Sequence, residues 1–251
     1  MSTASKPHAG KVAVITGASR GLGAGMAEQF AAEGMRLGLC ARNEPIAPED
    51  CADSDVVLAA VDVRDAAAVA NFAEQVGAQL GPIDLWINNA GVLDPIAPMR
   101  DVEPGQFAEH LAINVLGVFH GSRAFVHHLR AAARGGALIN VSSGAARSPY
   151  EGWSAYCAAK AAVDRFTEVI AREEAAAGLR AWAVAPGVID TDMQAQIRSR
   201  SAEEFPLVER FREMKQQNAF STPAQVAKGM LELAFGDAGS GPGEVLVDLR
   251  G

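Results

Sequence analysis

A serine, a tyrosine and a lysine occur close together between Val141 and Lys160, and these residue types can share one proton. Tyr156 and Lys160 are four residues apart, and the alanine-rich sequence after Gly152 predicts a helix that places both side chains on one face. An ammonium about 4 Å from the hydroxyl, at an effective dielectric constant of about 20, would favour the phenolate by roughly 4 kcal/mol and bring the tyrosine pKa from about 10 toward neutral. Ser143 lies at the end of an apolar run, residues 136–142, that predicts a buried strand, so all three side chains can converge on one point. Their pattern indicates acid–base chemistry.

A tyrosine–lysine pair is by itself usually a surface contact, so its interpretation depends on the rest of the chain. The 251 residues are 49% hydrophobic and 21% charged, as expected for one α/β domain or two small ones. The net charge of −8, without a basic run, argues against a nucleic-acid-binding protein. Cys40, Cys51 and Cys157 lack metal-ligand spacing, and no apolar run approaches membrane-spanning length. We therefore expect a cytoplasmic protein with no metal and no membrane contact.

Seven apolar segments predict strands, and helical segments separate them. The strands are expected at residues 11–16, 36–41, 55–62, 83–88, 136–142, 179–185 and 244–249. This alternation, without a linker or an internal repeat, predicts an α/β single-domain Rossmann fold with a doubly wound seven-stranded parallel sheet and helices on both faces. Residues 1–10 are expected to form a disordered lead and residues 11–251 one NADP-binding catalytic domain, in which residues 191–218 form a mobile helical flap over the substrate.

Local signals predict several helix ends and loops. Asp65 is expected to cap a helix over residues 66–80, and Gly81 with Pro82 would end it. Further expectations are a cap at Gly34, a surface loop over residues 42–53, a long helix over residues 106–133 with a break near Gly117 or Gly121, and a helix start at Thr222, Pro223 and Gln225.

Gly17, Gly21 and Gly23 lie between the first predicted strand and the first predicted helix. Glycines at such a turn let the backbone approach a pyrophosphate, whose charge the helix N-terminus stabilises. The alternative is a tight structural turn without a ligand.

The end of the second predicted strand distinguishes the two nicotinamide coenzymes. An NAD site would place a carboxylate there, whereas this chain has Ala41 and Arg42, with Arg20 in the glycine-rich turn. Two guanidinium groups near a 2′-phosphate favour NADP(H), although either arginine alone is more often a solvated surface charge. Asp62, at the end of the third strand, would accept from the adenine amino group or else cap a turn.

Several motifs occur in one order along nearly the whole chain: TGASRGLG at 16–23, Asp62, NNAG at 88–91, Asn114, Ser143, Tyr156-x-x-x-Lys160 and PGVIDT at 186–191. With these motifs the chain resembles the short-chain dehydrogenase/reductase family, whose members act on CH–OH and C=O groups. The resemblance implies that Tyr156 donates a proton to the carbonyl oxygen and that Ser143 orients this oxygen. It also implies that Lys160 holds the nicotinamide ribose and lowers the tyrosine pKa, and that Asn114 maintains a helix kink and a water relay.

The same resemblance implies a coenzyme site at the strand ends. Asn88, Ala90 and Gly91 would line its adenosine side, and Val188 and Thr191 would contact the nicotinamide carboxamide. The residues expected to bind NADP(H) are Gly17, Ser19, Arg20, Gly21, Leu22, Gly23, Ala41, Arg42, Asp62, Val63, Asn89, Ala90, Gly91, Tyr156, Lys160, Pro186, Gly187, Val188 and Thr191.

Around the predicted site the chain is similar to sepiapterin reductase and to bacterial benzil reductases. This likeness lies in PYEGWSAYCAAK at 149–160, in DTDMQ at 190–194 and in Asp248. It implies a pocket for a flat ring beside a vicinal diketone, with Asp248 matching the carboxylate that anchors a pterin. The expected pocket residues are Leu93, Tyr150, Trp153, Cys157, Met193, Gln194 and Asp248. On chemistry alone, Trp153 is more often packed in a core and Asp248 is more often solvated.

We therefore expect an NADPH-dependent carbonyl reductase that acts on a small ketone or vicinal diketone carrying an aromatic or pterin-like ring. One alternative is a 3-oxoacyl reductase or secondary-alcohol dehydrogenase of the same family. A non-catalytic NADP-sensing protein is a further alternative, but it would have no need to keep Ser143, Tyr156 and Lys160 together. The alanine-rich segment 155–170 would pack two subunits of a homodimer or homotetramer.

Overall fold

The computed structural model describes residues 6–217, 219–236 and 244–250, which fold around one seven-stranded sheet. The strands are β1 (Val12–Thr16), β2 (Arg36–Ala41), β3 (Val56–Ala60), β4 (Leu85–Asn88), β5 (Gly136–Val141), β6 (Leu179–Ala185) and β7 (Leu246–Asp248). Their order is β3-β2-β1-β4-β5-β6-β7, and every neighbouring pair is parallel. The predicted doubly wound Rossmann fold is confirmed.

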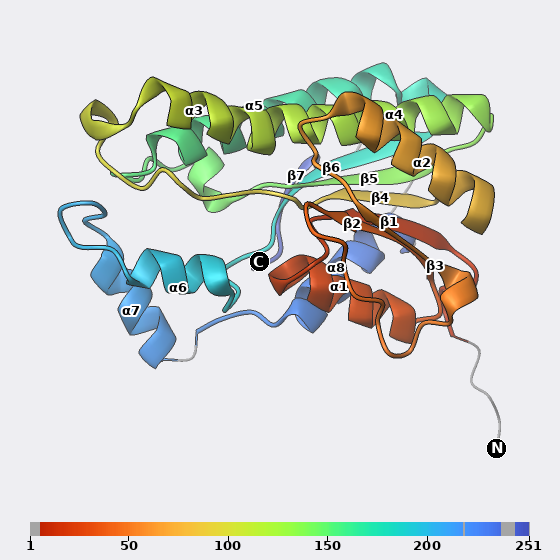
Figure 1. Cartoon of the computed structure of the whole chain (residues 1–251), viewed down its shortest axis with the longest axis horizontal. Coiled ribbons are helices and arrows are strands. Elements are labelled where there is room, and N and C mark those ends of the chain that lie inside the picture. Colours follow the sequence, from red (N-terminus) through yellow and green to blue (C-terminus); the bar gives the residue numbers. More distant parts are fainter. Residues whose placement is uncertain (1–5, 218, 237–243, 251) are drawn as a thin grey trace.

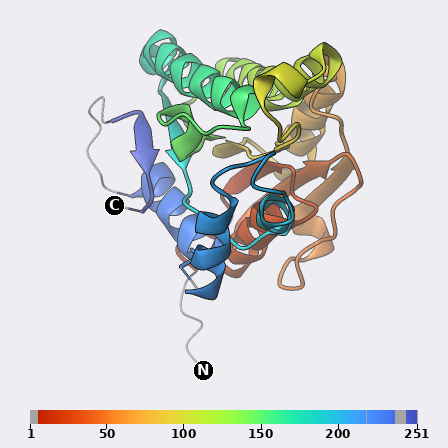
Figure 2. The same ribbon diagram turned by 90° about the vertical axis from the view of Figure 1, so that its left-hand side faces the viewer.

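Helices cover both faces of this sheet (Figure 1). One face carries α2 (Ala66–Leu80), α4 (Gly117–Ala131) and α5 (Ser154–Glu173), and the other carries α1 (Gly21–Ala32) and α8 (Pro223–Phe235). Three shorter helices, α3 (Pro104–Leu111), α6 (Asp192–Arg198) and α7 (Val208–Gln216), complete the set in the described ranges. Seen from the side, α6 lies in front of the sheet (Figure 2). None of the helices in these ranges is long and apolar enough to cross a bilayer.

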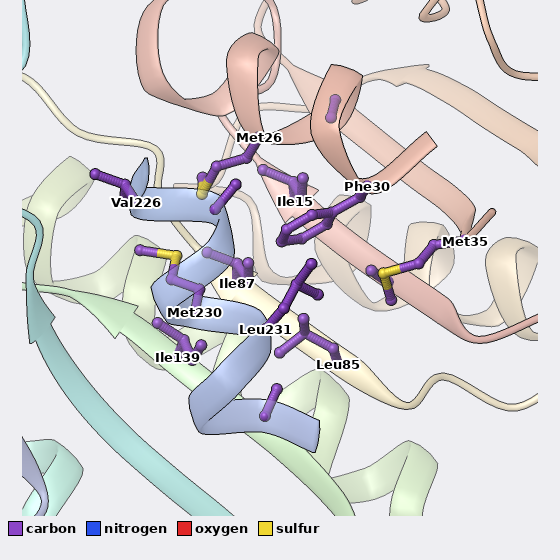
Figure 3. Close-up of a cluster of buried hydrophobic side chains, with 14 of the residues drawn as sticks. Ile15, Met26, Phe30, Met35, Leu85, Ile87, Ile139, Val226, Met230 and Leu231 are labelled. Atoms are coloured by element: carbon purple, nitrogen blue, oxygen red, sulfur yellow. The ribbon is translucent and has the colours of Figure 1, made fainter. Parts of the chain in front are cut away.

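Two hydrophobic cores explain why the strands are apolar on both faces. Successive side chains of a strand point to opposite faces, so Ile15 packs on the α1 and α8 side whereas Val14 packs on the α2 and α4 side. Figure 3 shows the first core, where Phe30 and Leu231 pack over the sheet. Every residue of β1 is buried, as expected for a central parallel strand.

The helix ends that depend on local chemistry agree with the prediction. The Asp65 side chain accepts hydrogen bonds from the amides of Ala67 and Ala68 and caps α2. Thr222 and Gln225 form a capping box at the start of α8. Gly34 adopts a left-handed φ of +84° just after α1, which glycine does at little cost.

The break in the long helix is a π-helical segment, Ala112–Leu116, which ends directly before Gly117, one of the two expected positions. At its centre Asn114 Nδ2 donates to the carbonyls of Val92 and His110, at 3.0 and 3.2 Å, and Asn114 Oδ1 accepts from the Val92 amide. These bonds attach the helix to the segment after β4. A π bulge often marks a functional position. Gly121 instead allows close packing, because a Cβ there would overlap Asn88 and lie 2.8 Å from the Trp86 indole nitrogen.

Three further segments are expected outside the sheet and its covering helices: the chain before β1, a surface loop over residues 42–53 and a flap over residues 191–218. Residues 1–5 of the expected disordered lead lie outside the described ranges, whereas residues 6–10 form turns that bond the Gly10 amide to the Gly34 carbonyl at 3.1 Å. Residues 42–52 form a loop without helix, as expected, before a single turn at Asp53–Asp55. The expected flap contains α6 and α7, and its last residue, 218, lies outside the described ranges.

Candidate active site

A cavity of about 1080 Å³ opens at the carboxyl ends of the strands. Residues that follow β1 to β6 form its wall, together with residues of α6 and α7. This is the position where open parallel sheets bind ligands. The volume slightly exceeds the roughly 300–1,000 Å³ of typical small-molecule pockets, so the cavity has room for an extended ligand and a second molecule beside it.

The glycine-rich turn after β1 forms one end of the cavity. Gly17 has a φ of +69°, and a Cβ there would lie 2.7 Å from the Ala90 Cα, so only glycine fits. Gly21 also has a positive φ and begins α1, whose N-terminal amides receive no side-chain cap from Arg20. Such open amides bind phosphate groups. The turn and the helix end therefore fit a pyrophosphate.

Gly23 lies behind this wall rather than in it. A Cβ on Gly23 would overlap the Gly17 carbonyl oxygen and lie 2.7 Å from Asn89 Nδ2. Asn89 donates from that nitrogen to the carbonyls of Thr16 and Gly17, at 3.0 and 3.1 Å. Gly23 and Asn89 thus shape the turn. Asn88 points away into the core, where it bonds Trp86, Ser122 and Asn140, so the expectation that it lines the adenosine side is wrong.

The region after β2 and β3 carries the charges predicted to select the coenzyme. Ala41, Arg42 and Asp62 line the cavity, together with Glu44, a carboxylate outside the predicted site residues. Asp62 accepts hydrogen bonds from the Arg64 guanidinium at 2.9 and 3.0 Å and from the Arg64 amide, and these bonds hold the pKa of its carboxyl below the usual value. Asp62 therefore takes part in the turn, and its contact with adenine stays a prediction.

Arg20 lies at the mouth of the cavity and forms an ion pair with Asp192 at the start of α6. Its Nη1 atom is 3.2 Å from Asp192 Oδ2, and both side chains are exposed. An exposed pair of this kind contributes at most about 1 kcal/mol, so it can be exchanged for a stronger partner. Asp192 belongs to the DTDMQ motif and is a second charged wall residue outside the predicted site residues.

Ser143 and Tyr156 meet at the centre of the wall. Ser143 follows β5, and its Oγ accepts from the Ala145 amide at 3.2 Å. Tyr156 extends from the first turn of α5, and a hydrogen bond with Ser143 lowers its pKa, while burial, the larger effect, raises it. Lys160 lies behind them, only 5% exposed, and its Nζ donates to the Val141 carbonyl at 2.7 Å.

Burial controls the protonation of this group. It raises the pKa of Tyr156 to about 12 and lowers the pKa of Lys160 to about 8. The expectation that Lys160 brings the tyrosine pKa toward neutral is therefore wrong for this structure. The tyrosine pKa is raised because other side chains enclose the phenol. The Lys160 ammonium is directed to a backbone carbonyl and lies over the phenol ring, 5.6 Å from its centre.

Aromatic rings form the other end of the cavity. Tyr150, Trp153 and Phe211 line it with Leu93, Met193 and Gln194. Trp153 is 5% exposed and stacks on Phe205 at 4.6 Å between ring centres, so it belongs to both the wall and a small core. Phe205 and Phe211 come from the flap, about fifty residues beyond Trp153, and sequence spacing gave no sign of their contact.

Two of the predicted pocket residues lie outside the wall. The Cys157 thiol is directed to the Ser148 carbonyl at 3.8 Å. Asp248 forms an ion pair with Arg250, whose Nε donates to Asp248 Oδ1 at 2.9 Å. Arg250 itself lines the cavity, so the end of the sheet presents a cation to it rather than the predicted carboxylate.

The flap is attached to the rest of the site by polar contacts. Asp94, after β4, accepts from Arg200 at 3.0 Å and from Gln196 of α6. Asp190 accepts from Arg198 at 3.2 Å and also pairs with Lys215 of α7. These contacts hold α6 and α7 against the aromatic end of the cavity.

The cavity wall also contains most of the other residues predicted to bind the coenzyme. These are Ser19, Leu22, Val63, Ala90, Gly91, Pro186, Gly187, Val188 and Thr191. Asn114 lies behind it, at the centre of the π-helical segment, while its neighbour Ile113 reaches the wall.

Known proteins resemble this chain in both sequence and structure. Residues 11–202 match the family model described as short chain dehydrogenase. Benzil reductase ((S)-benzoin forming) of Bacillus cereus is 35% identical over 230 residues, covering 88% of this chain and 92% of that protein. The benzil reductase ((S)-benzoin forming) of Bacillus subtilis (strain 168) is 30% identical over 229 residues, covering 88% and 91%. The crystal structure of carveol dehydrogenase from Mycobacterium avium in complex with NAD matches with a TM-score of 0.79 and 27% identity, covering 96% and 97%.

Proposed function

The chain belongs to the short-chain dehydrogenase family and is an oxidoreductase of alcohol and carbonyl groups, and from this premise we propose that it is an NADPH-dependent carbonyl reductase. Its proposed substrate is a ketone or vicinal diketone on an aromatic or pterin-like ring. The observation that carries the proposal is one cavity with two ends. Ser143 and Tyr156 lie between a glycine-rich turn and an aromatic wall.

The glycine-rich end fits a dinucleotide, because Gly17 leaves no room for a Cβ and the first amides of α1 are open. When bound there, NADPH supplies the hydride. Lys160 would hold the nicotinamide ribose, since an ammonium has three donors and Val141 accepts from it.

In this proposal Tyr156 is the proton donor. Its raised pKa keeps the hydroxyl protonated at neutral pH, as reduction of a carbonyl requires. Ser143 would donate a second hydrogen bond to the same oxygen and stabilise its developing negative charge. Tyr156 is only 8% exposed, so little of its side chain contacts water.

The preference for NADPH rests on Arg20 and Arg42 at the adenosine end. A 2′-phosphate would pair with both guanidinium groups and would displace Asp192 from Arg20. Glu44 in the same wall and the NAD complex of carveol dehydrogenase are the observations that favour NADH instead. The coenzyme must therefore be tested in the same assay as the substrate.

The proposed substrate class rests on the aromatic wall and on the two benzil reductases that the chain resembles. Tyr150 and Trp153 lie 5.1 Å apart at 30°, and rings arranged in this way can extend the stack to a flat substrate. A 3-oxoacyl chain or a simple secondary alcohol would leave these rings without a partner. A non-catalytic NADP-sensing protein would need neither the rings nor the hydroxyl pair.

A steady-state assay distinguishes these functions. We expect turnover of benzil or sepiapterin with NADPH, and a lower kcat/KM with NADH. Turnover confined to 3-oxoacyl thioesters would contradict the proposed substrate class, and an equal or higher kcat/KM with NADH would contradict the proposed coenzyme. Tight NADPH binding without turnover of any carbonyl would instead support the binding protein.

We also propose that the protein is a cytoplasmic homodimer or homotetramer that pairs through α5. Cys40, Cys51 and Cys157 are free, as expected for a reducing compartment. Val169 of α5 and Phe119 of α4 are 45% and 43% exposed, and a second subunit would cover them. Phe119→Glu should lower the mass measured by light scattering, whereas Ile46→Glu, at a site 89% exposed beside the cavity, should not. A monomeric wild type would contradict the proposal.

A further inference from the structure

A buried carboxylate lies behind the Ser143, Tyr156 and Lys160 group. Asp164 is on α5, one turn beyond Lys160, and is 8% exposed. It is not among the residues that line the cavity. Burial raises the pKa of its carboxyl, which means that the charged form is kept at a cost in free energy.

Asp164 is bonded to the strand that carries Ser143. Ser142 donates from its Oγ to Asp164 Oδ1, and Arg147 lies 3.9 Å from Asp164 Oδ2. Val141 ends β5, and Ser142 and Ser143 follow it directly. The Val141 carbonyl is held by Lys160, the Ser142 hydroxyl is held by Asp164, and Ser143 reaches the cavity.

Asp164 lies four residues after Lys160 on α5, so the two side chains share one face of this helix. Burial lowers the pKa of Lys160, and the charge of Asp164 raises it. From α3, His110 faces Lys160, and burial lowers the pKa of this imidazole, so it is uncharged at neutral pH. From its own helix, Lys160 faces Tyr156, which is protonated there. On the far side of Asp164 lie Arg147 and Glu168.

We propose that Asp164 is a positioning residue of this reductase, which keeps Lys160 charged and, through Ser142, holds Ser143 in place. The inference rests on the proposed function, because it assigns Asp164 a role in that site. One carboxylate would thus control both the charge of Lys160 and the position of Ser143. No direct contact of Asp164 with substrate or coenzyme is required.

Three variants separate the charge from the hydrogen bond. Asp164→Asn keeps an oxygen for Ser142 but removes the charge, Ser142→Ala keeps the charge but removes the bond, and Asp164→Glu keeps the charge. The wild-type kcat for reduction should fall as pH rises through the Lys160 pKa of about 8. In Asp164→Asn this fall should move to lower pH by about one pH unit. In Asp164→Glu, kcat should again decrease at the wild-type pH. Ser142→Ala should lower kcat by about tenfold or less, without changing the pH at which kcat decreases.

A second measurement needs neither coenzyme nor substrate. Below the folded Lys160 pKa of about 8, the buried charge destabilises the folded protein, and this cost decreases as pH rises and the folded protein releases the proton. Asp164→Asn should increase this destabilisation, because it removes the negative charge near Lys160. The difference in unfolding free energy between wild type and Asp164→Asn should therefore be largest near pH 7 and smaller at pH 9.

The outcomes are distinct for the two proposals. The role of Asp164 would be overturned if kcat of Asp164→Asn decreased at the same pH as in the wild type. It would also be overturned if Ser142→Ala shifted this pH as much as Asp164→Asn does. A wild type that reduces no carbonyl but shows the pH-dependent stability difference would contradict the proposed function while supporting the link between Asp164 and Lys160. Should Asp164→Asn fail to fold, the Lys160→Met background provides the test. Asp164→Asn should fold there, since no buried ammonium remains, and continued failure would overturn the inference.

Discussion

The Lys160 ammonium lies 5.6 Å from the centre of the Tyr156 ring and donates to the Val141 carbonyl at 2.7 Å. Their spacing on α5 places the two side chains together, as expected for residues four apart on a helix. The direction of the ammonium then decides the chemistry. Because it bonds a backbone carbonyl, burial dominates the tyrosine pKa and the phenol stays protonated at neutral pH. The resting site is therefore ready to donate a proton.

Removal of the Tyr156 hydroxyl should stop catalysis without affecting the coenzyme. A positioned general acid contributes about 10²- to 10⁴-fold to a rate, so Tyr156→Phe should lower kcat by that factor. The dissociation constant of NADPH, measured by its fluorescence, should change little. Tyr150→Phe is the matched control, because it removes a hydroxyl from the same cavity and should retain most of kcat. A Tyr156→Phe variant with a tenth or more of wild-type kcat would contradict the assigned role.

The raised tyrosine pKa can be measured directly, since the chain has two tyrosines. In Tyr150→Phe, the absorbance of tyrosinate near 295 nm reports Tyr156 alone. At pH 10 the folded protein should show little tyrosinate, because the pKa of Tyr156 is raised to about 12. The unfolded chain should be about half ionised at that pH. Above pH 10 the unfolded chain releases this proton and the folded protein does not, so this group lowers stability as pH rises further. Appreciable tyrosinate at pH 8 would instead support control by Lys160.

The coenzyme preference should depend on Arg42 more than on any other single side chain at the β2 end. A charge-assisted hydrogen bond contributes about 1.5–3 kcal/mol, so Arg42→Ala should weaken NADPH binding by about tenfold or more and leave NADH binding nearly unchanged. Asp192→Ala is the control for Arg20, because it removes the present partner of that arginine and should leave NADPH binding equal or tighter. Equal losses for NADPH and NADH would contradict the proposed phosphate contact.

Local sequence signals predicted the fold well, because each depends on a few neighbouring residues. The Asp65 cap, the glycine after α1 and the burial of β1 on both faces need only short-range chemistry, and all occur as expected. The parallel arrangement of the strands follows from their alternation with helices. Ser143 lies beside Tyr156 because both are at the carboxyl end of this sheet.

Features that depend on distant residues could not be predicted in this way. The π-helical segment lies at Asn114 because this side chain bonds Val92, 22 residues earlier. The protonation of Tyr156 depends on burial, and Trp153, which contacts its ring, is packed by Phe205 and Phe211 of the flap. Arg250 reaches the cavity because β7 ends there. Spacing along the sequence gives no sign of these contacts.

The glycine-rich turn should tolerate no side chain at Gly23. A Cβ there would overlap the Gly17 carbonyl oxygen and lie 2.7 Å from Asn89 Nδ2, so the turn must move. Gly23→Ala should destabilise the protein by about 1–3 kcal/mol, as overpacking does, and should weaken NADPH binding by more than tenfold if the turn holds the pyrophosphate.

Gly105→Ala is the matched control, because a Cβ on this residue of α3 meets nothing within 4 Å. Its stability should rise by about 0.5–1 kcal/mol, since alanine loses less conformational entropy in a helix, and its NADPH affinity should match the wild type. Thermal unfolding and NADPH fluorescence measure both effects. If Gly23→Ala bound NADPH as tightly as Gly105→Ala, the pyrophosphate would have to lie elsewhere in the cavity.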